Sequence, residues 1–180
     1  GNGGVTADAL GKVGKAVSFD GVGDYISASQ AVVNQTQQSI STWVNMQTLA
    51  TGKPIIGQWG NSQNSFIIKT DDTSSDEIRV CIASSLTDNC TIYGLTTDAN
   101  ITANAWNNIQ VVYEGTQSSD ATRLKLYING LEKTLAFTGT IPSTLQTSTE
   151  ELEVGGDLDL GVYTHVLIDE VILWNRALSA

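Results

Sequence analysis

The residues that could perform chemistry in this chain are few, and their arrangement does not favour catalysis. The only histidine, His165, would have to serve any Ser-His-Asp triad, and no Gly-x-Ser-x-Gly motif provides a nucleophile. Glycosidases use a pair of carboxyl groups, and Glu151 and Glu153 would share one strand face. They stand at the start of an expected strand, where solvated charge is the commoner role. The sequence therefore predicts a protein that is not an enzyme.

Two cysteines, Cys81 and Cys90, are the only ones in the chain. Expected strands at 77–83 and 90–95 read as a hairpin, which would place the cysteines across from each other. Cys81 alternates with the apolar residues of its strand and should point away from the core. A disulfide closing so short a loop would contribute about 2.7 kcal/mol. Two unpaired thiols are the alternative, whereas a zinc site is not expected because His165 is the only histidine.

The aromatic residues give the candidate ligand contacts. Trp59 stands in a polar segment, 57–64, where packing does not readily explain an indole. Sugars stack on exposed aromatic faces while amides bind their hydroxyls, so Trp59 and Asn61 are candidate glycan contacts, and Tyr163 is another. A structural role is the alternative for each. The other tryptophans fall on expected strands and are predicted core residues: Trp43, Trp106 and Trp174.

Length and charge limit the class of protein. The 180 residues are enough for one domain with a substantial core. A net charge of −10 repels phosphate backbones and anionic membranes, so no nucleic-acid partner is expected, while divalent cations are attracted. No apolar run approaches the roughly 20 residues of a membrane span. Few charged residues and many Ser and Thr favour an exported β-protein, and the chain reads as a fragment of a larger one.

Period-2 alternation dominates the sequence, and no window shows a convincing helical period. The segment 123–128 alternates polar and apolar residues and is followed by Asn129-Gly130, the favoured pair for a two-residue type I′ hairpin turn. Short, regularly spaced strands without helices predict a sandwich or barrel. The other expected strands are 16–20, 24–28, 39–47, 54–59, 65–70, 77–83, 90–95, 106–113, 150–155 and 166–175.

Several motifs in a fixed order carry a family resemblance. They are GKVGKAVSFDGVGDYI at 11–26, SISTWV at 39–44, AWNNI at 105–109, LYING at 126–130 and IDEVILWNRALS at 168–179. The ordered set resembles the laminin-G-like jelly-roll domains of the concanavalin A-like lectin/glucanase superfamily. The resemblance implies an all-β, two-sheet antiparallel jelly-roll sandwich over 1–180, with 1–14 as a leading segment. The glucanase branch carries Glu-x-Asp-x-x-Glu on one strand, and neither 150–153 nor 157–159 matches it.

The resemblance also implies a structural calcium where the first and last strands meet. Asp169 is the matching position, on a strand whose two faces are both apolar, and a buried carboxylate is costly unless it is paired or binds a metal. Asp20, or carbonyls of its turn, could supply the other side. The alternative is that Asp169 accepts hydrogen bonds from backbone amides while Asp20 makes an Asx turn before Gly21.

These observations predict a non-catalytic extracellular recognition module, secreted or on a cell surface, that binds a glycan or a cell-surface protein. It should be monomeric as an isolated domain. One alternative is a structural spacer without a small ligand. The other is an accessory domain of a larger polysaccharide-degrading enzyme. The fold does not fix the ligand.

Overall fold

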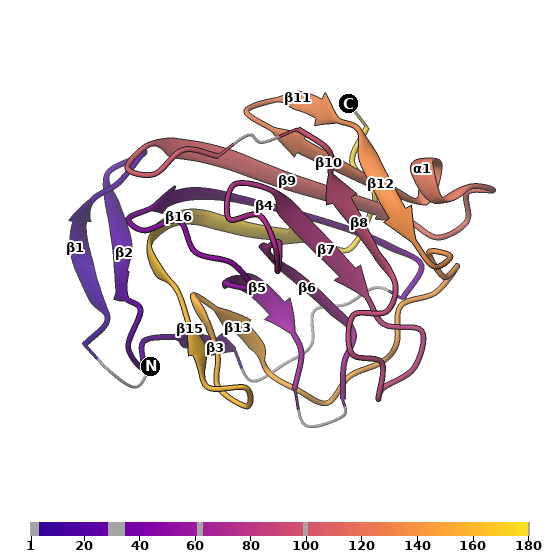
Figure 1. Ribbon diagram of the computed structural model, residues 1–180, viewed down its shortest axis with the longest axis horizontal. Coiled ribbons are helices and arrows are strands. Elements are labelled where there is room, and N and C mark those ends of the chain that lie inside the picture. The colour runs from indigo at the N-terminus through magenta and orange to yellow at the C-terminus, as the bar shows by residue number, and fades with distance from the viewer. Residues whose placement is uncertain (1–3, 29–34, 61–62, 99–100, 180) are drawn as a thin grey trace.

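The computed structural model describes residues 4–28, 35–60, 63–98 and 101–179, and these residues form two antiparallel seven-stranded sheets packed face to face (Figure 1). This confirms the predicted jelly-roll sandwich. The terminal sheet contains, in spatial order, β1 (Thr6–Leu10), β2 (Lys15–Asp20), β16 (His165–Trp174), β4 (Gln37–Met46), β9 (Trp106–Glu114), β10 (Leu124–Ile128) and β11 (Leu131–Lys133). The disulfide sheet contains β12 (Leu135–Thr138), β8 (Tyr93–Thr96), β7 (Ile78–Ile82), β6 (Phe66–Thr70), β5 (Pro54–Gln58), β13 (Leu152–Val154) and β3 (Ile26–Ala28).

Five described elements lie outside the predicted set: β1, which falls in the predicted leading segment, β12, and three small elements near the ends of the sandwich. β14 (Gly156–Asp157) and β15 (Val162–Tyr163) form a short hairpin before β16. The helix α1 (Asp120–Arg123) has four residues and lies at the opposite end of the sandwich from β1 and β2 (Figure 1). Within the part of the chain that the structure describes, no helix is long and apolar enough to span a bilayer.

The core fills the space between the sheets because alternate residues of each strand point inward. Ile78, Val80 and Ile82 of β7 face Ile109 and Val111 of β9 within one cluster of buried side chains. Burial of aliphatic side chains like these contributes about 1.5–3 kcal/mol each. The inward face is almost entirely apolar, so ligand chemistry has to come from the outer faces and the loops.

The predicted hairpin at Asn129-Gly130 is confirmed. Leu131 pairs with Ile128, and the two turn residues have φ of 53° and 79°, as a type I′ turn requires. The chain then passes from the terminal sheet to the disulfide sheet through Thr134, the one residue between β11 and β12.

A β-bulge interrupts β16, which lies between β2 and β4 as its two apolar faces predicted. Asp169 pairs with Trp43 and Ile172 with Ser41, so two residues of β16 oppose one residue of β4. Glu170, inside the bulge, has φ of 51°. The extra residue shifts the alternation by one, so that Leu173 packs against the core and its neighbour Trp174 faces outward.

The three strand tryptophans are not core residues, so that prediction is wrong. Trp43, Trp106 and Trp174 are each partly exposed, and none of them belongs to the core cluster or packs against it among the described residues. In β4 and β9 the reason is the alternation, because the inward positions belong to neighbours such as Val44 and Ile109. In β16 the reason is the bulge.

Candidate functional site

One end of the sandwich carries an open hollow of about 150 Å³, called here the rim hollow. Its polar lining comes from Asp20 at the end of β2, Thr48 and Lys53 after β4, and Tyr163 and His165 around the start of β16. The pairing of His165 with Asp20 places the last and first long strands side by side there. Residues far apart in sequence therefore supply a phenol, a hydroxyl, an ammonium, an imidazole and a carboxylate to one opening.

Two glycines set the shape of the rim hollow. Gly21 has φ of 82°, and a Cβ there would lie 3.1 Å from the backbone N of His165. Gly156 pairs with Tyr163, and a Cβ at Gly156 would lie 2.8 Å from the Tyr163 ring. Both positions thus need a residue without a side chain, and the Tyr163 ring lies against the β14 backbone, with its centroid 6.4 Å from that of Tyr25.

Hydrogen bonds order the polar side chains of the rim hollow. The Thr48 hydroxyl lies 3.1 Å from Nδ1 of His165. Oδ1 of Asp20 accepts a bond from the Val22 amide at 2.6 Å, which is the predicted Asx turn. The Asp20 amide in turn donates to Oδ2 of the buried Asp24 at 3.0 Å. Tyr163, a candidate ligand contact from the sequence, therefore lies among ordered polar groups, and its role stays a prediction.

Trp59 is 6% exposed, so the expectation of an exposed indole is wrong. Trp59, the residue directly after β5, packs on the outer face of the disulfide sheet with Ile67, Cys81 and Ala83 in a satellite cluster. A hollow of about 60 Å³, the sheet hollow, lies beside it. Packing thus accounts for this indole, and Asn61, its predicted partner, lies outside the described residues.

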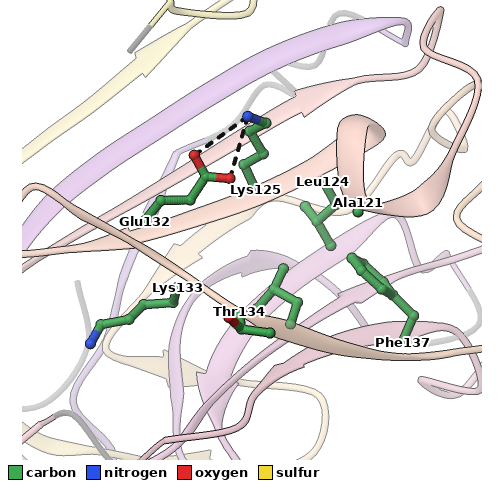
Figure 2. A pocket seen from close by; sticks show the side chains of 8 residues that line it. Ala121, Leu124, Lys125, Glu132, Lys133, Thr134 and Phe137 are labelled. Carbon is green, nitrogen blue, oxygen red and sulfur yellow. Dashed lines mark hydrogen bonds and ion pairs between the residues drawn. The ribbon is translucent and has the colours of Figure 1, made fainter.

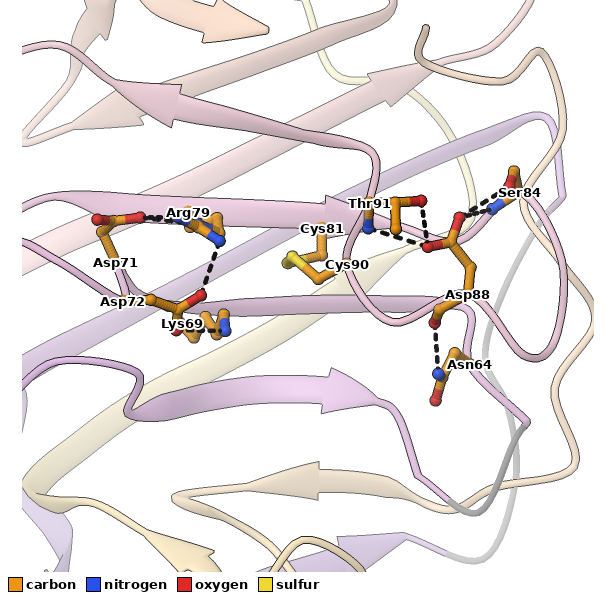
Figure 3. Close-up of a disulfide and its surroundings, with 10 residues drawn as sticks. All are labelled: Asn64, Lys69, Asp71, Asp72, Arg79, Cys81, Ser84, Asp88, Cys90 and Thr91. Atoms are coloured by element: carbon orange, nitrogen blue, oxygen red, sulfur yellow. Dashed lines mark hydrogen bonds and ion pairs between the residues drawn. A yellow bond between two sulfur atoms is a disulfide. The ribbon is translucent and has the colours of Figure 1, made fainter. Parts of the chain in front are cut away.

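The disulfide between Cys81 and Cys90 is present, with Cα atoms 5.1 Å apart (Figure 3). Cys81 faces away from the main core as predicted, but the satellite cluster buries it completely. The loop that follows is held by Asp88, whose carboxylate accepts bonds from Ser84 and Thr91 (Figure 3). Burial alone would raise the pKa of Asp88, but the hydrogen bonds from Thr91 and Ser84 outweigh burial, so the net effect is a lowered pKa.

Ion pairs cover the same outer face. The Arg79 guanidinium lies 4.1 Å from the Tyr93 ring centroid and pairs with Asp71 and Asp72 (Figure 3). Burial would raise the pKa of Asp71, but hydrogen bonds from Thr73 and Arg79 outweigh it and lower the pKa to about 2. Because these polar side chains already bind one another, few of them are left on this face to bind a ligand.

An acidic loop, residues 157–162, lines one side of the sheet hollow. Glu153 of β13 contacts this loop, so the expectation that its carboxylate is fully solvated is wrong. Its Oε2 accepts the Leu158 amide at 2.9 Å, and burial and nearby carboxylates raise its pKa to about 7. Asp157 is 2% exposed, its Oδ1 accepts the Leu160 amide at 2.9 Å, and burial raises its pKa. These carboxylates hold the loop through their backbone hydrogen bonds.

Asp20 and Asp169 do not come together. Val17 pairs with Ile168 and Asp20 with His165, so the two carboxylates stand four residues apart along the strands, about 13 Å. Oδ2 of Asp169 accepts the Val13 amide and Oδ1 accepts the Glu170 amide, each at 2.9 Å. This is the predicted alternative of backbone hydrogen bonds. Among the described residues no three His, Cys, Asp or Glu side chains are grouped to hold a metal, so the donor set does not fit a calcium shared by Asp20 and Asp169.

A third hollow, of about 200 Å³, opens where the chain crosses between the sheets (Figure 2). Phe137 and Leu124 form its apolar side, and Lys125 and Glu132 form an ion pair at its rim (Figure 2). No pattern in the sequence indicated this hollow, because most of its residues occupy ordinary strand positions.

Comparison with known proteins identifies the family. The model of the concanavalin A-like lectin/glucanases superfamily matches residues 20–180. The chain belongs to this superfamily. The predicted resemblance is therefore confirmed over most of the domain. A search of the curated proteins finds no match.

Solved structures of this superfamily fold share the architecture at low identity. Domain 4 of AbnA, a GH43 extracellular arabinanase from Geobacillus stearothermophilus in complex with arabinotriose, has 23% identity and a TM-score of 0.62 over 99% of this chain and 78% of that one. A SAP-like pentraxin from Limulus polyphemus has 15% identity and a TM-score of 0.64, covering 91% and 77%. The binding domain of botulinum neurotoxin serotype D has 14% identity and a TM-score of 0.67, covering 99% and 42%. At these identities the likeness shows the fold.

Proposed function

We propose that this superfamily member is a non-catalytic, extracellular carbohydrate-binding module whose glycan contacts lie in the rim hollow. The observation that carries the proposal is the lining of this hollow, where the partly exposed Tyr163 ring stands beside Thr48, Lys53 and His165. An aromatic ring offers a stacking surface for a sugar, and the polar groups offer donors and acceptors to its hydroxyls. Thr48 and His165 are already oriented by their mutual bond, which lowers the entropic cost of binding.

Two further observations support the extracellular role. The disulfide is typical of oxidising compartments. The arabinanase domain that shares the fold is part of an extracellular enzyme and was solved with arabinotriose. Arabinotriose is therefore the first probe, within a wider panel of neutral oligosaccharides. The net charge of −10 opposes binding of acidic polysaccharides.

The decisive experiment compares Tyr163→Ala and Tyr163→Phe by calorimetric titration with arabinotriose and by glycan-array binding. Removal of the ring should weaken oligosaccharide binding by about tenfold or more, while Phe, which keeps the ring, should retain most of it. Leu10→Ala, at an 85% exposed position of β1, is the matched surface control. Equal binding by Tyr163→Ala and wild type would place the glycan elsewhere, and hydrolysis of the probes would contradict the non-catalytic role.

A further inference from the structure

The outer face of the terminal sheet carries aromatic side chains from four different strands. They are Trp174 of β16, Trp43 of β4, Trp106 of β9 and Tyr127 of β10, all partly exposed. Trp106 pairs with Asn45, so Trp43, two residues along β4, is its diagonal neighbour at about 7–8 Å. A face with this many rings turned to solvent is unusual for a sheet that has its own core, and such surfaces mark binding sites.

A groove of about 270 Å³ lies on the same face, larger than the rim hollow. Val112 and Tyr127 lie on neighbouring strands along it, and residues 177–179 form one wall. That wall is fixed, because Oγ of Ser39 donates to the Arg176 carbonyl at 2.9 Å and accepts the Leu178 amide at 3.0 Å. The volume is close to the lower end of typical ligand sites.

The groove and the rings beside it carry almost no net charge. Lys125 lies 3.3 Å from Glu132 (Figure 2), and the Lys12 ammonium lies 4.7 Å from the Trp43 ring centroid. The Glu114 carboxylate accepts bonds from Gln37 and Thr116 at 2.7 Å each, so two cations balance two carboxylates. Between the rings the outward positions of β4 and β9 are hydroxyls and amides: Ser39, Ser41, Asn45, Asn108 and Gln110. This contrasts with a chain whose net charge is −10.

We infer that this face is a second binding site, which takes an uncharged polysaccharide chain lying in the groove and continuing over the indoles. Rings separated by amides and hydroxyls suit a ligand that alternates apolar ring faces with hydroxyl edges. A protein partner would favour a contiguous apolar centre instead. Because the face carries no net positive charge, it would not attract an acidic polysaccharide. The site lies on the sheet opposite the satellite cluster and does not depend on the rim hollow.

The test is affinity electrophoresis of the whole domain in gels containing soluble arabinan, xylan, mixed-linkage β-glucan or galactomannan. Wild type should be retarded by at least one of them. Tyr127→Ala and Trp106→Ala should each weaken the retardation about tenfold. Tyr127→Phe keeps the ring but removes the bond from its hydroxyl to Glu132, and it should behave as wild type. Leu10→Ala should also be unchanged, and melting curves confirm that each variant is folded.

The outcomes separate the two sites. Tyr163→Ala should lose arabinotriose binding but keep its retardation by polysaccharide. The proposal for the rim hollow can therefore be wrong while the second site is right, and the reverse also holds. Retardation of Tyr127→Ala and Trp106→Ala at wild-type strength would overturn the second site, as would an absence of retardation of wild type in all four gels. So would sedimentation showing a wild-type dimer that Tyr127→Ala converts to a monomer, because the face would then join two copies.

Discussion

The outer faces of the two sheets have opposite characters. On the disulfide sheet a tryptophan, a disulfide and ion pairs between Arg79 and its acidic neighbours cover the strands. On the terminal sheet the aromatic side chains are partly exposed, with amides and hydroxyls between them and the Lys12 ammonium over the Trp43 ring. The difference shows that an indole is not buried merely because it lies in a strand, nor exposed because it lies in a loop. Its burial depends on whether neighbouring residues pack over it.

The largest expected effect compares one indole from each face. Trp59→Ala removes a buried aromatic side chain and should lower the free energy of unfolding by about 3–5 kcal/mol. Trp106→Ala, on the open face, should cost clearly less because water already reaches its ring. Denaturant unfolding followed by circular dichroism measures both. Equal losses would mean that the two faces are equally packed.

Reduction of the disulfide is the next largest change. Cys81→Ala with Cys90→Ala should destabilise the domain by about 2.7 kcal/mol, since the bridge restricts the unfolded chain. Intact mass after alkylation of the native, unreduced protein should show no added label. Incorporation of two labels would show that Cys81 and Cys90 are not bonded to each other.

The Asp169 carboxylate should act through its backbone bonds rather than through calcium. Asp169→Asn leaves one of the Val13 and Glu170 amides without an acceptor, at a cost of about 1–3 kcal/mol. Calcium binding here stays a prediction without support from the geometry, so we expect millimolar calcium and chelator to change the melting temperature of wild type and variant equally. A calcium response in wild type that Asp169→Asn abolishes would contradict this account.

The smallest expected effect concerns pH and the acidic loop. Burial raises the pKa of Glu153 to about 7 from 4.5, so the folded state binds more protons than the unfolded state between these values. Stability from this group is therefore present below about pH 4.5 and lost as pH rises through about 7. Glu153→Gln should flatten that decline in melting temperature by a few degrees, and the exposed Glu151→Gln should not. Identical pH profiles for Glu153→Gln and wild type would contradict the buried role.

Local patterns predicted the parts of the fold that local chemistry determines. Asn129-Gly130 defined a turn because its φ values favour these residue types, and the strands around Cys81 and Cys90 brought the sulfurs together. Tyr163 was named as a candidate ligand contact, but the groups beside it come from β2, the segment after β4 and β16 and could not be assembled from sequence. Burial of Trp59 was missed because it depends on side chains in and next to the neighbouring strands β6 and β7.

The bulge at Glu170 decides which side chains in the second half of β16 face the core. Regular pairing of β16 with β4 without the bulge would turn Leu173 outward and Trp174 toward the core, whereas deletion of Glu170 would leave Val171 opposite Thr42 and keep both side chains where they are. An assignment of faces by simple alternation from Asp169 would therefore put both side chains on the wrong side. The bulge absorbs one residue more than regular pairing needs, and this keeps Leu173 inside and Trp174 on the polysaccharide face.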